Sequence, residues 1–206
     1  MKHGRLFVIA APSGAGKTSL VKALLASEPR LRLSVSHTTR KRRPTEEDGR
    51  EYHFVAVPQF EGLVARGEFL EHARVFDNFY GTARGFVEEQ LRQGHDVILE
   101  IDWQGAQQVR RAMPQCVSIF ILPPSRRALA ERLARRATDS PEIIARRLRD
   151  AAADMSHSRE FDYVIVNDEF AQAVSDLRRI VAGRAEDLTS ARPALAPLLA
   201  ELLAPP

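Results

Sequence analysis

The chain has 206 residues, of which 44% are hydrophobic and 28% are charged, and its formal net charge is +3. These fractions are ordinary for a soluble globular protein and exclude a disordered, collagen-like or fibrous chain. The length suits one domain, or one core domain with an inserted lobe. The net charge is too small to indicate a nucleic-acid coat protein.

In chain order, the predicted elements are a strand at 6–10, a helix at 19–26, a strand at 33–35, a loop at 38–50, a helix at 58–66, strands at 68–75 and 79–82, a helix at 84–93, a strand at 97–101, a helix at 104–111, a strand at 116–122, helices at 125–136 and 141–157, a strand at 163–166, and helices at 169–185 and 195–203. Strands that alternate with helices favour an α/β fold with a parallel sheet covered on both faces. Residues 36–83 break this rhythm. We therefore predict a core formed by 1–35 and 84–206, with 36–83 as an inserted lobe.

The basic residues are unevenly divided between the two types. Of the 30 basic residues, 26 are arginine and only Lys2, Lys17, Lys22 and Lys41 are lysine. General codon bias is one explanation, and a site that grips phosphates is another. Arginine has a planar fork that suits bidentate phosphate contacts, so the second explanation stays open.

The single cysteine, Cys116, cannot form an internal disulfide. No apolar run approaches the roughly 18 residues that span a bilayer. The apolar stretch at 6–11 is shorter than the core of a secretory signal. These features predict a cytoplasmic protein in a reducing compartment.

Residues 11–18 match the phosphate-loop pattern G-x-x-x-x-G-K-[ST], with Ala11 in place of the first glycine. Gly14 and Gly16 allow backbone N–H groups to turn toward phosphate oxygens, and the following helix presents its positive N-terminus to the same anion. Lys17 is expected to reach the β- and γ-phosphates, and the Thr18 hydroxyl to ligate Mg²⁺. A simple glycine turn is the alternative, but the strand before it and the helix after it favour a nucleoside triphosphate site.

Two acids, Glu100 and Asp102, lie at the end of the predicted strand 97–101. An acid in this position of a phosphate-loop enzyme commonly helps to place Mg²⁺ through water. Their alternation predicts that both project from one side of the strand, which favours a shared task. Solvated acids at the end of a strand are the alternative.

Residues 38–43 form a basic run, and the turn at 49–54 that follows it carries aromatic residues. Taken alone, a charge run is usually a solvated loop. The surrounding segments change this interpretation, because together they resemble the signature of the guanylate kinase family. The matching segments are 36–44, 48–54, 69–71, 78–82, 99–105, 121–125 and 164–168. The resemblance extends from about residue 5 to residue 188.

The resemblance implies a P-loop kinase core with a parallel sheet flanked by helices, an inserted GMP-binding lobe at 36–83 and a helical lid at about 126–150. It implies transfer of the γ-phosphoryl group of ATP to GMP, and also to dGMP, in purine nucleotide metabolism. It further implies Mg²⁺ as the cofactor and ATP and GMP as the small-molecule partners. Neither nucleic acid nor membrane is expected as a partner, and a homo-oligomer is left open.

Site residues follow from the resemblance position by position. The catalytic residues are Lys17, Arg40, Arg132, Arg136 and Arg147. The ATP-binding residues are Ala11, Pro12, Ser13, Gly14, Ala15, Gly16, Lys17, Thr18, Ser19 and Asn167. The GMP-binding residues are Ser36, Arg40, Arg43, Tyr52, Glu71, Tyr80, Gly81, Thr82, Glu100 and Asp102. Mg²⁺ is expected on Thr18, with Glu100 and Asp102 acting through water.

Simple chemistry supports the guanine assignment. One carboxylate, such as that of Glu71, can accept both the N1–H and the N2 amino group of guanine, whereas adenine would present an acceptor at N1. The hydroxyls of Ser36 and Thr82 can donate to guanine O6. No general base is required, because the attacking phosphate oxygen is largely ionised at pH 7.

Two alternatives remain. A kinase acting on AMP or dTMP would share the phosphate loop and the lid arginines, but not the signature at 38–54. A non-catalytic guanylate-kinase-like module that binds proteins would be expected to lose phosphate-loop residues and lid arginines. This chain keeps Lys17, Thr18, Arg132 and Arg136, which favours an enzyme.

Overall fold

The computed structural model describes residues 3–75, 77–134 and 141–204, without the side chains of 141–145. The chain divides into two compact units. Unit 1 comprises Met1–Val8 and Pro29–Val117, and unit 2 comprises Ile9–Glu28 and Ser118–Pro206. Strand β1 (Leu6–Ala10) contributes residues to both units, because the boundary falls after Val8.

Unit 1 contains two sets of strands. Its further elements are β2 (Leu31–Leu33), β3 (His37–Thr38), β4 (His53–Phe54), α2 (Val57–Ala65), β5 (Phe69–Val75), β6 (Asn78–Ala83), α3 (Arg84–Arg92), β7 (Asp96–Glu100) and α4 (Trp103–Ala112). Strands β2, β7 and β1 lie in that order, with β2 parallel to β7. Val97, Ile98 and Leu99 of β7 are fully buried, as is typical of parallel strands covered on both faces.

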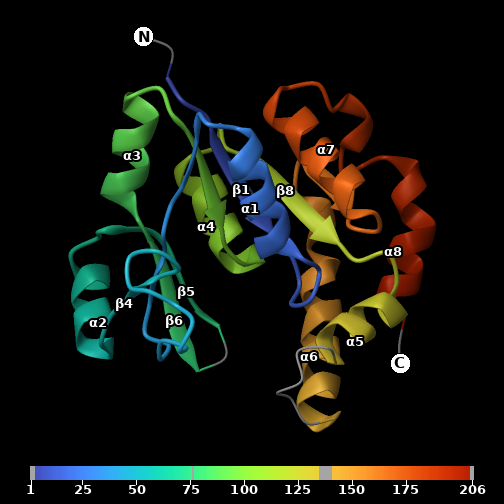
Figure 1. Ribbon diagram of the computed structural model, residues 1–206, viewed down its shortest axis with the longest axis horizontal. Helices are drawn as coiled ribbons and strands as arrows, with labels where there is room; N and C mark the ends of the chain where they lie inside the picture. Colours follow the sequence, from blue (N-terminus) through green and yellow to red (C-terminus); the bar gives the residue numbers. More distant parts are fainter. Residues whose placement is uncertain (1–2, 76, 135–140, 205–206) are drawn as a thin grey trace. The chain divides into compact units, whose positions relative to one another are not determined.

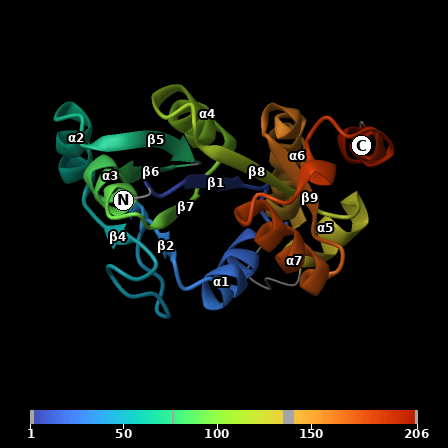
Figure 2. The ribbon, with the colours of Figure 1, turned by 90° about the horizontal axis from the view of Figure 1, so that it is seen from above.

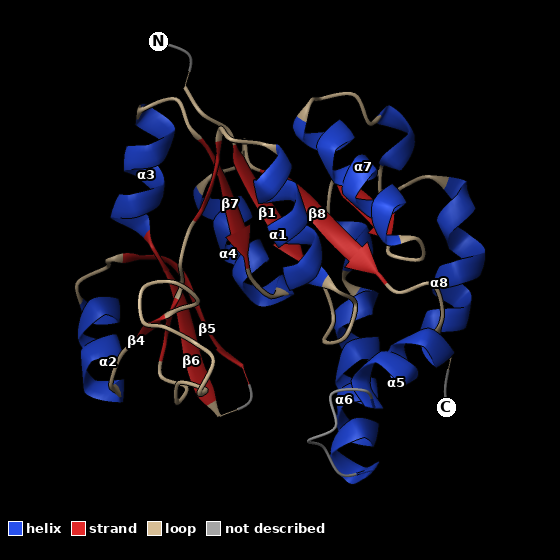
Figure 3. Cartoon of the chain, in the orientation of Figure 1, coloured by secondary structure: helices blue, strands red, loops and turns tan. Residues whose placement is uncertain are grey.

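The second set of strands in unit 1 has the order β4-β3-β6-β5. Strand β6 pairs antiparallel with both β3 and β5, whereas β3 pairs in parallel with β4. Helices α2 and α4 pack against β5 (Figures 1 and 2). Figure 3 shows the irregular loop that joins β3 to β4, which carries the basic run of the sequence.

Unit 2 places helices around a short parallel sheet. Its elements besides β1 are α1 (Lys17–Ser27), β8 (Val117–Leu122), α5 (Arg126–Ala134), α6 (Pro141–Ser156), β9 (Tyr163–Val166), α7 (Phe170–Val181), α8 (Ala196–Leu203) and three 3₁₀ turns at Ser158–Glu160, Glu186–Leu188 and Pro193–Leu195. Strands β1, β8 and β9 lie in that order, and β8 is parallel to β9. Helix α1 packs on α7, and α6 packs on both α5 and α8 (Figure 1).

The α/β class predicted from the sequence is confirmed, and most of the predicted elements are present. The predicted strand at 33–35 lies instead at Leu31–Leu33, because these residues pair with 96–98 of β7. Helix α7 ends at Val181, before its predicted end at 185. Gly183, which has a φ of 68°, follows it and provides the left-handed residue that commonly ends a helix.

No helix within the described ranges combines the length and apolar character required to cross a bilayer.

Candidate active site

The phosphate loop in unit 2 connects β1 to α1. Gly14 and Gly16 have φ angles of 90° and 93°, in the left-handed region that glycine adopts at little cost. Gly16 is the N-cap of α1 and provides no side-chain cap. Lys17 and Thr18 form the start of the helix, with Lys17 half-buried and Thr18 exposed. A glycine turn that leads into a helix N-terminus is suited to holding phosphate.

Neighbouring segments of unit 2 brace this loop closely. The side-chain Nδ2 of Asn167, directly after β9, donates to the carbonyl oxygen of Ala15 at 2.7 Å. A Cβ at Gly16 would collide with that Nδ2, and a Cβ at Gly14 would lie 3.0 Å from Leu129 and Leu133 of α5. Asn167 was predicted to bind ATP. It contacts the phosphate loop itself, so its visible task is to position that loop.

Arg132 of α5 lies beside the same asparagine. Its Nη2 donates to the carbonyl oxygen of Asn167 at 2.9 Å. Its Nη1 is buried and has no hydrogen-bond partner among the described residues. A buried donor without an acceptor is costly, and a ligand oxygen would remove this cost.

Of the other two predicted lid arginines, Arg147 lies within the described residues and Arg136 does not. Arg147 lies half-buried on α6. Arg136 lies outside the described residues, as does the predicted turn between the two lid helices. The lid prediction therefore rests on Arg132 and Arg147.

The predicted guanine pocket is built on β5 and β6 of unit 1. Glu71 and Thr82 occupy paired positions on the two strands, and Glu71 is only 3% exposed. The Thr82 hydroxyl donates to Glu71 Oε1 at 2.5 Å. A hydroxyl has one proton, so Thr82 cannot donate to guanine O6 while it donates to Glu71. This hydrogen bond differs from the role expected for Thr82 from the sequence.

Gly81 and Ser36, two further predicted GMP-binding residues, have close packing and backbone contacts in unit 1. A Cβ at Gly81 would lie 3.1 Å from the rings of Phe60 and Phe69, so a side chain there would crowd both rings. The carbonyl oxygen of Ser36 accepts from the N–H of His53 at 2.9 Å. This bond extends the short pairing between β3 and β4 and holds the half-buried Ser36.

The predicted acceptor-phosphate residues also gather in unit 1. The guanidinium carbon of Arg40 lies 5.4 Å from the centre of the Tyr52 ring. The rings of Tyr52 and Tyr80 meet edge to face at 5.8 Å. Burial, above all, raises the pKa of Tyr52 to about 12, so its hydroxyl remains a neutral hydrogen-bond donor at physiological pH. One guanidinium and two phenols are thereby brought together.

Glu46 organises the two arginines of this loop. It accepts from Arg40 Nη2 at 2.7 Å and from the backbone N–H of Arg43 at 2.8 Å. This hydrogen bond to Arg40 lowers the pKa of Glu46, and the same contact raises the pKa of Arg40. The side chain of Arg43 is 67% exposed. The sequence did not single out Glu46, although a run of acids at 46–48 begins three residues after the end of the basic run at 43.

The two predicted magnesium-site acids have different settings in unit 1. Glu100 is the last residue of β7. Asp102 lies beyond the strand and is the N-cap of α4, where its Oδ1 accepts from the N–H of Gly105 at 2.7 Å. The expected alternation along one strand face therefore does not reach Asp102. Its capping task was not predicted.

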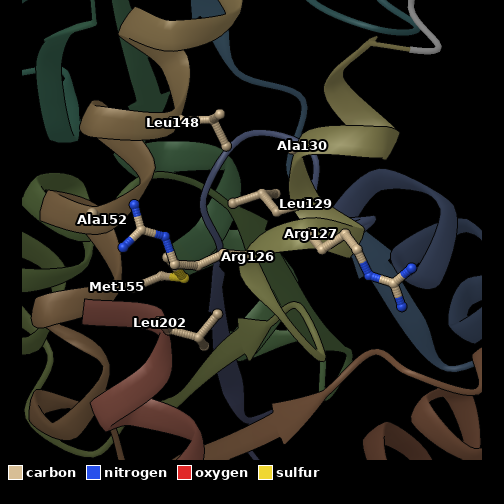
Figure 4. Close-up of a pocket in the computed structure, with 8 residues that line it drawn as sticks. All are labelled: Arg126, Arg127, Leu129, Ala130, Leu148, Ala152, Met155 and Leu202. Atoms are coloured by element: carbon tan, nitrogen blue, oxygen red, sulfur yellow. The ribbon is translucent and has the colours of Figure 1, made fainter. Parts of the chain in front are cut away.

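A separate cavity of about 270 Å³ lies between α5, α6 and α8 of unit 2 (Figure 4). Apolar side chains and two arginines line it: Leu129, Ala130, Leu148, Ala152, Met155, Leu202, Arg126 and Arg127. These lining residues include none of the predicted site residues. Leu129 both lines this cavity and lies close to Gly14 of the phosphate loop.

Comparisons with known proteins agree across the whole chain. A model of the guanylate kinase family matches residues 3–184. The guanylate kinase of Thiobacillus denitrificans is 63% identical over 174 residues, which are 84% of this chain and 83% of that protein. The guanylate kinase of Methylococcus capsulatus is 57% identical over 203 residues, which are 98% of this chain and 100% of that protein.

A solved structure agrees with these matches. The crystal structure of guanylate kinase from Anaplasma phagocytophilum has a TM-score of 0.75 at 33% identity, and the match covers 100% of this chain and 98% of that one. The matched residues include both the phosphate loop in unit 2 and the Glu71–Thr82 pair in unit 1. The chain belongs to the guanylate kinase family.

Proposed function

We propose that the protein is a guanylate kinase that transfers the γ-phosphoryl group of ATP to GMP, giving ADP and GDP. The observation that carries this proposal is the buried carboxylate of Glu71, which has the Thr82 hydroxyl on one oxygen. A buried carboxylate requires hydrogen-bond donors. Guanine provides two, at N1 and N2, whereas adenine would oppose the carboxylate with the lone pair at N1.

The GMP phosphate is bound by Arg40, Arg43, Tyr52 and Tyr80 in this proposal. The guanidinium and phenol groups gathered in unit 1 support it, because all of them donate hydrogen bonds to phosphate oxygens. Glu46 holds Arg40 in place before GMP arrives. Ser36, Gly81, Glu100 and Asp102 complete the proposed GMP-binding set.

The triphosphate of ATP is held by residues 11–19, with Lys17 on the β- and γ-phosphates. Arg132, Arg136 and Arg147 neutralise charge on the transferring phosphoryl group. The buried Nη1 of Arg132, which has no acceptor among the described residues, supports its part. The attacking GMP oxygen is already largely ionised at pH 7, so the protein positions the substrates and neutralises charge rather than removing a proton.

Mg²⁺ is the proposed cofactor, bound together with ATP. The Thr18 hydroxyl would be a direct oxygen ligand, the type that this hard cation prefers, and Glu100 and Asp102 would act through water. The exposed Thr18 hydroxyl at the start of α1 fits a direct ligand. When bound, the ion neutralises part of the phosphate charge.

A coupled assay of ADP release over GMP, dGMP, AMP and dTMP tests the proposal. We expect GMP to give the highest kcat/KM. Faster turnover with AMP or dTMP would assign the protein to another acceptor. Absence of ADP release with every monophosphate would favour the non-catalytic protein-binding alternative instead.

A further inference from the structure

Gly105, in the first turn of α4, lies directly against the carboxylate of Glu71. A Cβ at Gly105 would lie 2.6 Å from Glu71 Oε2, 3.1 Å from Glu71 Cδ and 3.3 Å from Asp102 Oδ1. Non-bonded heavy atoms attract best at roughly 3.5–4.0 Å and repel at much closer range. Even a methyl group at this position is therefore incompatible with the observed position of Oε2.

The two carboxylates nearest to the Cβ position at Gly105, those of Glu71 and Asp102, are each held by a hydrogen bond. Glu71 is buried, and its other oxygen, Oε1, accepts from Thr82 at 2.5 Å. Asp102 Oδ1 accepts from the N–H of Gly105 itself at 2.7 Å. A side chain at 105 would therefore act on a carboxylate that cannot move away without loosening its hydrogen bond to Thr82.

The backbone of Gly105 does not itself require glycine. Its φ is not among the positive values that Gly14, Gly16 and four other glycines adopt. Within a helix, glycine is less favourable than alanine. Glycine therefore occupies position 105 although it is a poor helix former and the backbone there would accept alanine. The close approach of the Glu71 carboxylate explains why alanine would not fit.

We infer that Gly105 is a specificity-determining residue for the acceptor base. Its missing side chain allows Glu71 Oε2 to stand where the carboxylate can accept both guanine donors. The inference rests on the proposed role of Glu71 in reading guanine. It adds a residue of α4 to a pocket otherwise built on β5 and β6.

Gly105→Ala tests this, with Gly85→Ala as the matched control. Gly85 lies in the first turn of α3, and a Cβ there would meet nothing within 4 Å.

We expect Gly105→Ala to raise the KM for GMP about 10- to 100-fold, the range of a lost hydrogen bond to a charged group. We expect the KM for ATP to stay unchanged and the preference for GMP over IMP, which lacks the N2 amino group, to shrink. Gly85→Ala should leave all three values unchanged. Gly105→Ala matching Gly85→Ala in all three would overturn the inference.

A double variant tests the route through Glu71. In a Glu71→Ala background the colliding carboxylate is absent. Adding Gly105→Ala should then change the KM for GMP by less than twofold, and the Tm should be equal to or above that of Glu71→Ala alone. A further large rise in KM, or a lower Tm, would show that Gly105 acts by another route. Should Gly105→Ala alone fail to fold, recovery of folding in the double variant would still assign the clash to Glu71, and no recovery would contradict it.

These measurements separate the inference from the proposed function. An unmodified protein that does not phosphorylate GMP refutes the proposed function, whatever the variants do. An active protein in which Gly105→Ala is silent refutes only the role of Gly105.

Discussion

At the scale of single residues, the pocket depends on how a buried carboxylate is satisfied. Glu71 faces Thr82 across β5 and β6 and accepts its hydroxyl proton. In the proposed function, this carboxylate also accepts the two adjacent donors of guanine. A carboxylate buried in this way discriminates by the cost of leaving polar groups unpaired.

Glu71→Gln is expected to lower kcat/KM for GMP about 10- to 100-fold, because an amide loses the charge-assisted hydrogen bonds to guanine. The ratio of kcat/KM for GMP to that for AMP should fall with it, since the glutamine amide can donate to adenine N1. Steady-state kinetics with both monophosphates measure the ratio. An unchanged ratio would remove Glu71 from the base pocket.

A second residue-scale prediction concerns stability against pH. The ring of His37 lies 4.7 Å from that of His53, and its buried Nδ1 has no partner among the described residues. Burial, reinforced by His53 and opposed by Asp48 and Glu68, lowers the pKa of His37. The unfolded chain therefore binds the proton more readily than the folded one. Stability should fall as the pH drops below about 6.5, the ordinary pKa of histidine.

His37→Gln should consequently show a smaller loss of unfolding free energy between pH 7.5 and pH 5.5 than the unmodified protein. Urea titrations at the two pH values measure this loss. His72→Gln, at an exposed position of β5, is the control and should retain the full loss. An equal loss in the His37 variant would rule out His37 as its source.

Some site residues could be predicted from the sequence, and others could not. A lone glutamate is usually exposed, so Glu71 could be identified only through its motif at 69–71. Glu46 and Gly105 act through contacts with residues that the family pattern had already identified. The contact of Gly105 with Glu71 joins positions 34 residues apart, and nothing in local spacing indicates such a contact.

At the scale of elements, one asparagine connects three segments of unit 2. Asn167 follows β9, donates to Ala15 in the phosphate loop, and accepts from Arg132 of α5. Its backbone N–H also donates to the Leu122 carbonyl at the end of β8. Asn167 therefore contacts both the phosphate loop and an arginine that is proposed to bind phosphate.

Asn167→Ala should raise the KM for ATP and lower stability by about 1–2 kcal/mol, the value of a buried hydrogen bond and the cost of leaving the Ala15 carbonyl unsatisfied. The KM for GMP should not change, because the proposed acceptor residues belong to unit 1. Kinetics and thermal unfolding measure these effects. Asp168→Ala, one residue on and exposed, is the control. A normal KM for ATP in the Asn167 variant would contradict the bracing role.

Helices and strands were predicted correctly where the apolar pattern extended over at least four residues. The apolar run at Leu6–Ala10 matches β1, and the predicted last strand matches β9. Strands β3 and β4 have two residues each, which is too short for any period to appear. Strand β4 was missed for this reason, and its pairing with β3 depends on tertiary contacts.

At the scale of the whole molecule, the predicted substrate sites divide between the two units. Every residue predicted to bind GMP lies in unit 1, and every residue predicted to bind ATP lies in unit 2. The inserted lobe predicted at 36–83 falls wholly inside unit 1. A break in the alternation of strands and helices predicted this lobe, but the sequence did not predict where the boundary between the two units falls.

Lys17→Ala and Arg40→Ala should separate the two binding events. Lys17→Ala should abolish phosphoryl transfer while GMP binding persists within about twofold, because its proposed contacts are with the triphosphate. Arg40→Ala should weaken GMP binding at least tenfold, as expected for a lost charge-assisted contact, and leave ATP binding unchanged. Calorimetric titration with each nucleotide measures both. Loss of GMP binding in Lys17→Ala would contradict the division.

The boundary within β1 bears on how the chain is synthesised. The polypeptide passes between the units after Val8, Glu28 and Val117. Unit 1 is complete once Val117 has left the ribosome, whereas unit 2 needs residues up to the C-terminal helix α8. Because domains generally fold as units during translation, we expect the residues proposed to bind GMP to become ordered while the phosphate loop still lacks the segments that brace it.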